Sequence, residues 1–259
     1  MKHIVSFSGG KDSTLMLILM LEKGMPIDDI IFADTGMEFQ ELYDYIERIE
    51  KLIGLKITRL KSKKTWDDLF FHKKQRGRYI GQINAFPMST ACIMTDRLKQ
   101  KPIQEYYRSI KTDFTVYIGI ARNEPKRYAR LKPNEKAPLY EWGIDENHVI
   151  QELKRRGLHN PLYDTFDRIG CYTCPNMTIK ELRLMRKRYP KEYAKLMWYG
   201  EQAEKHATKR RFAEFKPGWT MSELEKRFQM EDLTGKTLHK MKAVQDEGKS
   251  SRWVQDGSR

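Results

Sequence analysis

The sequence contains few cysteines and no long apolar run. Three of the 259 residues are cysteine, an odd number that gives no disulfide framework of the kind found in small secreted proteins. The longest apolar run covers residues 15–21 and is far too short to cross a bilayer. No signal-peptide pattern precedes the first expected strand. Hydrophobic residues make up 39% of the chain, enough for a core, so we expect a soluble cytoplasmic protein with no membrane partner.

Acidic residues are outnumbered by basic ones. The chain has 49 lysines and arginines against 35 aspartates and glutamates, a net charge of +14. A basic surplus attracts polyanions by a route that does not depend on their sequence, so nucleic acid is one candidate partner and a small anionic substrate is the other. Residues 61–78 and Tyr79 combine basic and aromatic side chains. This stretch is either a loop that holds a nucleic acid or an amphipathic helix with a solvated face.

The first 120 residues alternate between strand and helix patterns. Short β-type runs are followed by segments rich in helix formers, with glycine, proline and aspartate between them. Such alternation is typical of a parallel sheet with helices on both faces. We therefore expect an α/β fold with a doubly wound, mainly parallel sheet. The expected strands cover residues 2–8, 27–33, 55–60 and 114–120, and the expected helices cover residues 14–23, 39–52 and 96–110.

The pattern becomes helical after about residue 132. We predict an α/β domain over residues 1–132 and a helical, cysteine-bearing C-terminal part over residues 133–234, packed on the first. The basic polar tail over residues 235–259 has a composition that favours disorder. The helices expected in the C-terminal part cover residues 148–156, 179–188, 193–212 and 221–228.

The most informative stretch is the hexapeptide Ser-Gly-Gly-Lys-Asp-Ser, which lies between the first expected strand and the first expected helix. At such a junction, backbone N–H groups and the helix dipole favour an anion, and glycines let the backbone come close to it. Lysine adds a cation, and serine hydroxyls can donate hydrogen bonds to oxygens. An ordinary strand-to-helix turn capped by Asp12 or Ser13 is the alternative. We predict phosphate binding by Ser8, Gly9, Gly10, Lys11, Asp12 and Ser13, with Lys11, Asp12 and Ser13 as the catalytic residues.

The hexapeptide lacks the spacing of a Walker P-loop and instead resembles the PP-loop of N-type ATP pyrophosphatases. Further segments are similar to the branch of that superfamily that contains the phosphoadenosine-phosphosulfate (PAPS) reductases. The resemblance covers roughly residues 2–200, and it implies an adenine nucleotide alpha-hydrolase-like, Rossmann-like fold. The segments are Phe-Ala-Asp-Thr-Gly at residues 32–36, Cys-Ile-Met-Thr-Asp-Arg-Leu-Lys at residues 92–99, Gly-Ile-Ala-Arg-Asn-Glu-Pro-Lys-Arg at residues 119–127, Asn-Pro-Leu-Tyr at residues 160–163 and Arg-Ile-Gly-Cys-Tyr-Thr-Cys-Pro at residues 168–175.

The same resemblance implies an adenine nucleotide as the ligand, in the form of ATP with Mg²⁺. The nucleotide would lie across the carboxyl ends of the strands, where ligands of open parallel sheets bind. One of the implied residues, Asp34, is also a candidate helix cap. The implied binding residues are Ala33, Asp34 and Thr35 beside the adenine or ribose, and Gly119, Ile120 and Arg122 at the closing edge of the site.

All three cysteines fall in segments that resemble this one family. Two residues separate Cys171 from Cys174, a spacing that lets both thiolates reach one metal centre, and we predict that Cys92 shares it. Three thiolates suit a [4Fe–4S] cluster with one open iron, or Zn²⁺ with His159 or Asp164 as the fourth ligand, and we expect the cluster. A buried Cys92 with a redox-active Cys171–Cys174 pair is the alternative.

Three functions are compatible with these features. The PP-loop resemblance implies an ATP pyrophosphatase that adenylates an acceptor for sulfur transfer, in tRNA thiolation or DNA phosphorothioation. A cysteine desulfurase is then a candidate sulfur donor, and a second copy of the chain is a candidate partner. The alternatives are a sulfonucleotide reductase and a non-catalytic module that binds nucleotide or nucleic acid. We expect the pyrophosphatase, because the reductases that the chain resembles use a cysteine near the C-terminus and no cysteine follows Cys174.

Overall fold

The computed structural model describes residues 1–87 and 92–235 of the chain. The tail was predicted to cover residues 235–259, and all of it except residue 235 lies outside the described residues. The structure therefore does not test the prediction that the tail is disordered. No described helix is both long enough and apolar enough to cross a membrane.

Contacts within the chain group it into two compact units. The first unit holds residues 1–66 and 94–171, and the second holds, among the described residues, 67–87, 92–93 and 172–235. Residues 133–171, which sequence analysis assigned to the C-terminal part, make their contacts with the first unit.

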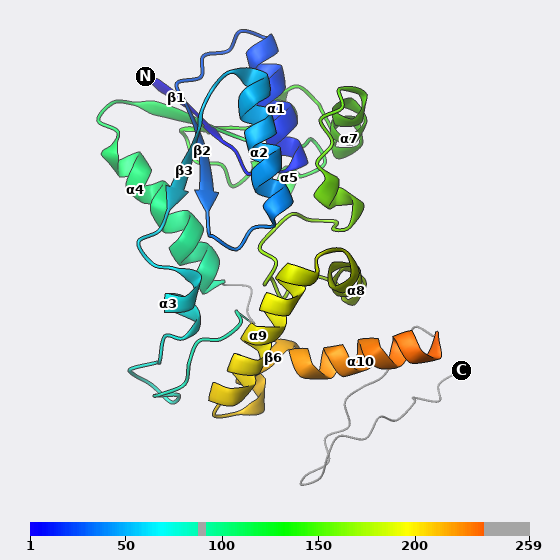
Figure 1. The fold of residues 1–259 in the computed structure, drawn as a ribbon. Helices are drawn as coiled ribbons and strands as arrows, with labels where there is room; N and C mark the ends of the chain where they lie inside the picture. Colours follow the sequence, from blue (N-terminus) through cyan, green and yellow to red (C-terminus); the bar gives the residue numbers. More distant parts are fainter. Residues whose placement is uncertain (88–91, 236–259) are drawn as a thin grey trace. The chain divides into compact units, whose positions relative to one another are not determined.

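The first unit is built on a five-stranded parallel sheet (Figure 1). The strand order is β3-β2-β1-β4-β5, so the chain first winds outward from the centre, then returns and winds outward on the other side. This is the doubly wound α/β fold that the sequence predicts, and its switch point lies between β1 and β4. The strands are β1 (Lys2–Ser6), β2 (Asp29–Asp34), β3 (Ile57–Lys61), β4 (Phe114–Ile118) and β5 (Glu135–Lys136).

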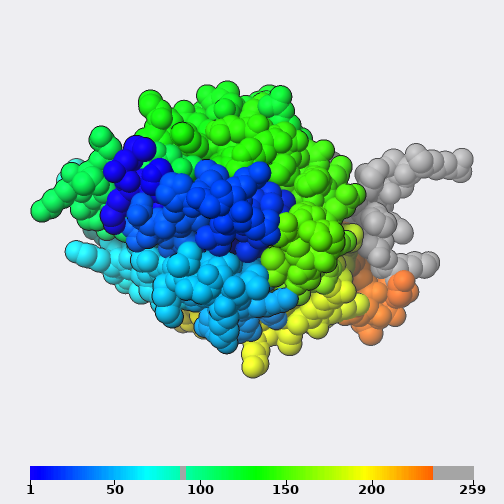
Figure 2. Space-filling view, turned by 90° about the horizontal axis from the view of Figure 1, so that it is seen from above, coloured from blue at the N-terminus to red at the C-terminus, as the bar shows by residue number. Residues whose placement is uncertain are grey.

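Helices cover both faces of this sheet (Figure 1). Helices α1 (Lys11–Glu22) and α2 (Gln40–Ile53) lie on one face, and α4 (Lys101–Ser109) lies on the other, as right-handed crossovers between parallel strands require. Helix α1 is buried on nearly all sides because α6 (Pro138–Glu141) and α7 (Glu146–Arg155) also pack against it. In the space-filling view, the blue N-terminal segment is contiguous with the green segment that carries α6 and α7 (Figure 2).

The segment between β3 and β4 differs from the single helix predicted over residues 96–110. Residues Thr95–Gln100 form a π-helical turn, η1, and α4 begins only at Lys101. Pro102 lies in the first turn of α4 and has no N–H to donate, so a regular α-helical hydrogen-bond pattern cannot run through this point. Short π-helical turns are frequent at functional sites, and residues of η1 line the main cavity of the first unit.

Several short elements of the first unit were not predicted. Each spans four residues or fewer, and hydrophobic periodicity cannot be read over a single turn or a two-residue strand. They are β5, α5 (Pro125–Tyr128), α6 and η2 (Pro161–Asp164).

The second unit is mainly helical and has an aromatic core. Phe70, at the end of α3 (Trp66–Phe70), packs against the rings of Phe86 and Tyr199, and Phe86 packs against Phe215. Tyr199, Phe70 and Phe215 are among the largest fully buried side chains. The elements that follow in this unit are α8 (Ile179–Arg188), α9 (Pro190–His206), η3 (Arg210–Phe212), β6 (Glu214–Lys216), β7 (Trp219–Thr220) and α10 (Met221–Thr234).

Two predicted helices of this unit have different ends in the structure. The helix predicted over residues 193–212 ends at His206, and a 3₁₀ turn and the β6–β7 hairpin follow it. The helix predicted over residues 221–228 continues to Thr234. Its start is fixed by a capping box, in which Thr220 and Glu223 each bond the other's backbone N–H.

Candidate functional site

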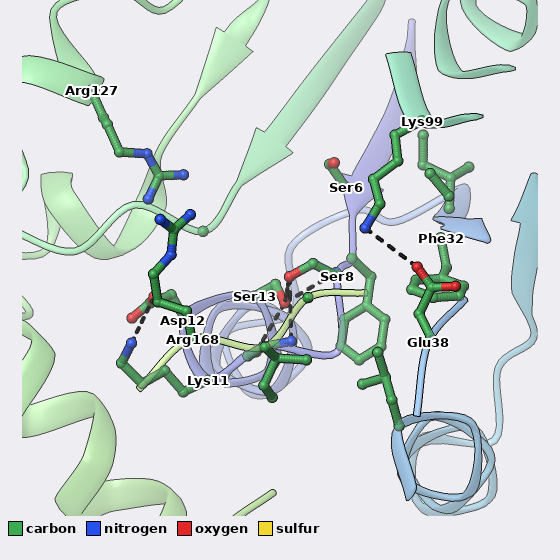
Figure 3. Close-up of a pocket in the computed structure, with 18 of the residues that line it drawn as sticks. Ser6, Ser8, Lys11, Asp12, Ser13, Phe32, Glu38, Lys99, Arg127 and Arg168 are labelled. Carbon is green, nitrogen blue, oxygen red and sulfur yellow. Dashed lines mark hydrogen bonds and ion pairs between the residues drawn. The ribbon is translucent and has the colours of Figure 1, made fainter. Parts of the chain in front are cut away.

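A cavity of about 780 Å³ opens in the first unit at the carboxyl ends of β1, β2 and β4 (Figure 3). Ligands of open parallel sheets bind at this edge, beside the switch point. The cavity wall comes from the loop after β1, the end of β2, η1, the segment after β4 and residues 163–170. Seven of the predicted site residues line it, namely Ser8, Gly10, Lys11, Asp12, Ser13, Ala33 and Gly119.

The loop at residues 8–13 joins β1 to α1 in a fixed conformation. Gly9 has a φ of +70°, which glycine adopts without strain, and a Cβ there would come within 2.5 Å of a side chain of α2. The hydroxyls of Ser8 and Ser13 lie 3.0 Å apart, and Ser13 donates a hydrogen bond to the Gly10 carbonyl oxygen at 3.0 Å. The N-terminus of α1 is thereby held at the cavity.

The loop is also held by two contacts from distant parts of the chain. A Cβ on Gly119 would lie 2.6 Å from the backbone nitrogen of Ser13 and 2.8 Å from the carbonyl carbon of Asp12, so only glycine lets the end of β4 approach the first turn of α1. Asn160 is buried and donates from Nδ2 to the Gly9 carbonyl oxygen at 3.0 Å. These contacts preorganise the loop without any ligand.

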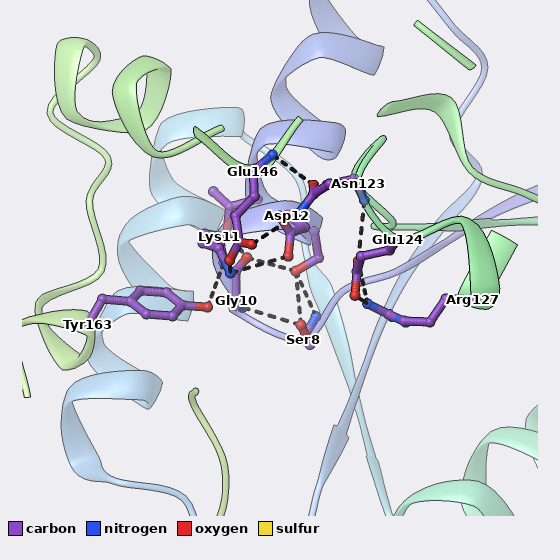
Figure 4. A network of polar contacts seen from close by, with 12 residues as sticks. Ser8, Gly10, Lys11, Asp12, Asn123, Glu124, Arg127, Glu146 and Tyr163 are labelled. Carbon is purple, nitrogen blue, oxygen red and sulfur yellow. Dashed lines mark hydrogen bonds and ion pairs between the residues drawn. The ribbon is translucent and has the colours of Figure 1, made fainter. Parts of the chain in front are cut away.

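Lys11 lies at the centre of a charged network (Figure 4). Its Nζ is 2.8 Å from Glu146 Oε1 and 3.6 Å from Asp12 Oδ2. Burial alone would lower the pKa of Lys11, but the hydrogen bond with Glu146 and the charge of Asp12 outweigh it and raise that pKa. The same hydrogen bond lowers the pKa of Glu146. At neutral pH, Lys11 is therefore a cation. Its nearest partner is the Glu146 carboxylate, whose side chain is about half exposed to solvent.

The cavity wall is not simply cationic. It holds four cationic side chains and five carboxylates. Three of the cations have a carboxylate partner, in the pairs Lys11–Glu146, Arg127–Glu124 and Lys99–Glu38. Arg168 forms no ion pair within residues 1–87 and 92–235. A polyanionic ligand would face the remaining carboxylates unless a divalent cation neutralised them.

Asp12 is the residue best placed to hold such a cation. Its Oδ2 faces Lys11, whereas its Oδ1 is buried without a hydrogen-bond partner among the described residues. Burial, with help from the charges of Glu124 and Glu146, raises the pKa of Asp12 above the ordinary value of 3.8. Within the described part of the chain, no three His, Cys, Asp or Glu side chains are placed to hold a metal by themselves. Mg²⁺ usually needs only one or two carboxylates together with phosphate oxygens, so Asp12 fits a magnesium–nucleotide complex.

We expect the variant Asp12→Asn to weaken the Mg²⁺-dependent binding of nucleotide without lowering the stability of the fold. A carboxyl group whose pKa rises on folding contributes stability that is complete below its unfolded pKa, near 3.8, and is lost as the pH rises through its folded pKa. At neutral pH the ionised group therefore costs free energy of folding. The variant should therefore unfold at the same or a higher temperature at neutral pH. The Mg²⁺ concentration needed for half-maximal nucleotide binding should rise about tenfold. Thermal unfolding and Mg²⁺ titrations check both parts, and a less stable variant with the wild-type Mg²⁺ requirement would contradict this role.

Tyr163 is a site residue to which sequence analysis gave no role. Its hydroxyl accepts a hydrogen bond from the backbone N–H of Lys11 at 3.0 Å, and Lys11 Nζ lies 5.2 Å from the ring centre. Burial raises the pKa of Tyr163, so the hydroxyl stays protonated. It occupies one of the N–H donors at the start of α1 that an anion would use. The sequence feature that could have indicated Tyr163 is its position in the segment at residues 160–163, which resembles the family.

Other polar residues of the wall were also missed. Most of them lie inside the segments that resemble the PAPS reductase branch, but the resemblance gave these positions no role of their own. Glu38, Glu146 and Asp167 lie outside these segments, and no pattern in the sequence indicated them. The missed residues with charged side chains are Glu38, Lys99, Glu124, Arg127, Glu146, Asp167 and Arg168.

The other end of the cavity, at the carboxyl end of β2, has a different character. Figure 3 shows Phe32, Glu38 and Lys99 there, apart from Lys11 and Asp12. The carboxylate of Glu38 is buried and lies 3.4 Å from Lys99 Nζ. With the apolar side chains of Phe32 and its neighbours, this end offers an aromatic and aliphatic surface with a small number of polar groups.

Five predicted binding residues are not part of the cavity wall of the described chain. Asp34 is buried and accepts a hydrogen bond at 2.8 Å from the N–H of Gly36, which forms an Asx turn. It does not cap the helix that follows, because the N-cap residue of α2 is Phe39. Burial alone would raise the pKa of Asp34, but its hydrogen bonds lower it. The guanidinium of Arg122 lies 4.6 Å from the ring centre of Tyr140. The five residues are Gly9, Asp34, Thr35, Ile120 and Arg122, and their direct binding role stays a prediction.

The three cysteines predicted to share a metal centre are all partly exposed, and none forms a disulfide bond. Cys171 belongs to the first unit, whereas Cys92 and Cys174 belong to the second. Within residues 1–87 and 92–235, no group of three His, Cys, Asp or Glu side chains is placed to hold a metal ion. The two residues considered as a fourth ligand, His159 and Asp164, bond to each other at 2.8 Å. The shared centre stays a prediction.

A parallel sheet with a polar loop and a cavity at its switch point is an arrangement typical of nucleotide-binding α/β proteins. Residues 2–177 match the phosphoadenosine phosphosulfate reductase domain, and the chain belongs to this family. The resemblance and the fold class predicted from the sequence are thereby confirmed.

Similar proteins match between about two thirds and four fifths of the chain. An uncharacterized protein of Methanocaldococcus jannaschii is 32% identical over 219 residues, which are 78% of this chain but only 42% of that protein. An adenosine 5′-phosphosulfate reductase of Lysinibacillus sphaericus is 27% identical over 184 residues, with 65% of this chain and 72% of that protein covered. Among solved structures, a PAPS reductase of Candida auris has a TM-score of 0.45 at 17% identity and covers 65% of this chain and 80% of that one. The chain thus spans less than half the length of its archaeal relative.

Proposed function

We propose that the cavity of the first unit binds ATP with Mg²⁺ and that the chain cleaves the bond between the α- and β-phosphates. The observation that carries this proposal is the loop at residues 8–13, which starts α1 at the switch point of the sheet inside a polar cavity. A helix N-terminus at such a point offers N–H groups and a positive dipole end to phosphates. Membership of the family supports a nucleotide as the ligand.

The two ends of the cavity suggest how the nucleotide would lie. The triphosphate would take the end formed by the loop, where Lys11, Arg127 and Arg168 supply cations (Figure 3). The adenosine would take the end of β2, with Phe32 and Ala33 beside it. Mg²⁺, held by Asp12 and phosphate oxygens, would neutralise the charge of the departing pyrophosphate.

In the proposed reaction, an acceptor oxygen without a proton, from a carbonyl or a phosphate, attacks the α-phosphorus. The bond from that phosphorus to the bridging oxygen breaks, and pyrophosphate leaves with its electron pair. Lys11 and Arg168 stabilise the negative charge that develops on the phosphates, since fixed cations in a partly closed site need no reorganisation. A sulfur nucleophile then displaces AMP from the adenylated acceptor. If a cysteine desulfurase supplies this sulfur as a persulfide, a thiol reductant must then break the S–S bond to release the thiolated product. We propose tRNA or DNA as the acceptor.

A sulfonucleotide reductase is the second candidate, and the similarity to the adenosine 5′-phosphosulfate reductase of Lysinibacillus sphaericus favours it. Such an enzyme would hold a sulfated nucleotide in the same cavity and release sulfite. The two functions are separated by giving the full chain ATP with Mg²⁺ and bulk RNA or DNA, and in parallel adenosine 5′-phosphosulfate or PAPS with a thiol reductant. Pyrophosphate and AMP in the first reaction support our proposal. Sulfite in the second alone supports a reductase, and nucleotide binding without either product supports a non-catalytic module.

A metal or cluster on Cys92, Cys171 and Cys174 is a separate proposal that rests on sequence spacing, and no step of the reaction depends on it. We expect protein purified without oxygen to carry about four irons with matching sulfide, and Cys171→Ala to lose them. Metal analysis and acid-labile sulfide counts check this. A single zinc without sulfide would make the centre a structural clip, and unchanged metal content in Cys171→Ala would contradict the shared site.

A further inference from the structure

The second unit carries a group of cations arranged around two aromatic rings. The rings of Tyr79 and Phe212 pack edge to face with their centres 5.1 Å apart. The guanidinium carbon of Arg211 lies 4.4 Å from the Tyr79 ring centre and 4.7 Å from that of Phe212, and Lys74 Nζ lies 4.8 Å from the Phe212 ring centre. We call this group the basic–aromatic cluster; its members are Lys74, Arg78, Tyr79, Lys209, Arg211 and Phe212.

The positive charge of this cluster is not compensated by nearby carboxylates. None of its four cations forms an ion pair within the two described stretches, 1–87 and 92–235. The neighbouring Arg210 behaves differently, since it pairs with Glu223 at 2.7 Å. Arg78, Lys209 and Arg211 are exposed, so a ligand can reach their charges from solvent. The cluster therefore presents an open positive surface with aromatic groups inside it.

A groove of about 550 Å³ adjoins the cluster and shares residues with it. Lys74, Arg211 and Phe212 line the groove, and Phe86 and Ile93 form part of its apolar wall. Its one carboxylate in the described wall, Glu214, accepts a hydrogen bond from the Gly218 N–H at 2.9 Å. An apolar, partly aromatic slot with cations along its border matches a flat base joined to a phosphate.

We propose that the groove and the basic–aromatic cluster bind single-stranded nucleic acid. Phosphates would contact the four cations, and unstacked bases would lie against the aromatic rings and the guanidinium planes. A duplex keeps its bases stacked and offers the groove only its backbone. An acidic protein segment would supply negative charge but no flat ring for the slot. The proposal concerns a different surface from the nucleotide cavity, so it goes beyond the proposed function and does not depend on it.

The test measures the binding of the full chain to labelled single strands of RNA and DNA of about 12 nucleotides, within the usual range of site sizes. A duplex of the same sequence and vesicles containing phosphatidylserine serve as the competing ligands. The variant Lys74→Ala/Arg78→Ala/Arg211→Ala removes three charges from the cluster. The matched control Lys51→Ala/Lys56→Ala/Lys111→Ala removes three exposed charges from the first unit.

We expect single strands to bind more tightly than the duplex or the vesicles. The cluster variant should lose at least about tenfold in affinity, and the slope of log K against log salt should fall by about two, since each phosphate contact on a single strand contributes about 0.7. The control variant should change much less. Tyr79→Leu, which keeps every cation, should also lose about tenfold because stacking on the ring is lost. Circular dichroism melting confirms that each variant is folded.

Four results would overturn the proposal. They are no binding of single strands, tighter binding of the duplex or the vesicles, equal losses in the cluster and control variants, and wild-type affinity in the folded Tyr79→Leu variant. The last of these would leave only a non-specific charge effect.

Discussion

Replacing Lys11 with alanine is expected to lower pyrophosphate release from ATP by on the order of a hundredfold or more, the usual cost of losing one fixed electrostatic contact to a transition state. Lys11 Nζ projects from the first turn of α1 into the cavity, where its present partner Glu146 is 46% exposed. Because that carboxylate can turn to water when the lysine is removed, the fold should stay intact. Pyrophosphate release and thermal unfolding measure the two parts.

The matched control for this prediction is Lys51→Ala, which removes an exposed lysine near the end of α2. We expect its turnover to equal that of the wild type. If Lys11→Ala turned over ATP as fast as Lys51→Ala, the loop at residues 8–13 would not be the site of the reaction. A loss of turnover together with a large fall in unfolding temperature would contradict the claim that Lys11 acts on the ligand and not on the fold.

The second large effect is expected from Gly119→Ala. The added methyl group would lie 2.6 Å from the Ser13 nitrogen and 2.8 Å from the Asp12 carbonyl carbon, and both are backbone atoms that cannot turn aside. Either β4 or the first turn of α1 must move, at a cost of about 1–3 kcal/mol for such overpacking. Since the N–H groups of that turn are the proposed phosphate donors, nucleotide affinity should fall about tenfold or more, as titration calorimetry would measure.

Gly170→Ala is the comparison for this variant. Gly170 also lines the cavity, but a Cβ there would meet no atom within 4 Å. Its effect on nucleotide affinity should be far smaller than that of Gly119→Ala. Equal effects of the two substitutions would show that the close approach of β4 to α1 has no role in holding the loop.

The topology of the first unit could be predicted because strand and helix patterns alternate locally along the sequence. The ends of the elements could not, because they are set by partners elsewhere in the chain. Strand β1 was expected to reach residue 8 but ends at Ser6, where its pairing with β2 and β4 stops and the loop begins. The π-helical turn at Thr95–Gln100 was likewise expected to be part of one helix, because six residues are too few for the period of the helix to be read from the sequence.

The candidate site was predictable only where its residues are neighbours in sequence. The loop at residues 8–13 has a recognisable order and position, and five of its six residues line the cavity. Tyr163 bonds to Lys11 from 152 positions away, and Glu146 reaches the same lysine from α7. No local pattern reveals such a contact, because folding alone brings these residues together. The three cysteines are a similar case. Their spacing suggests metal ligands, but it does not show where the thiol groups lie in the fold.

The central claim is that the loop at residues 8–13 holds the phosphates of an adenine nucleotide, and a structure of the full chain with Mg²⁺ and a non-cleavable ATP analogue tests it most directly. Our account predicts the phosphates at the N–H groups of Gly10 to Ser13, Mg²⁺ on Asp12 and the adenine beside Phe32. The Tyr163 hydroxyl should have left the Lys11 N–H. A nucleotide bound anywhere else on the chain, or one bound in the cavity with its phosphates at the β2 end, would contradict the account.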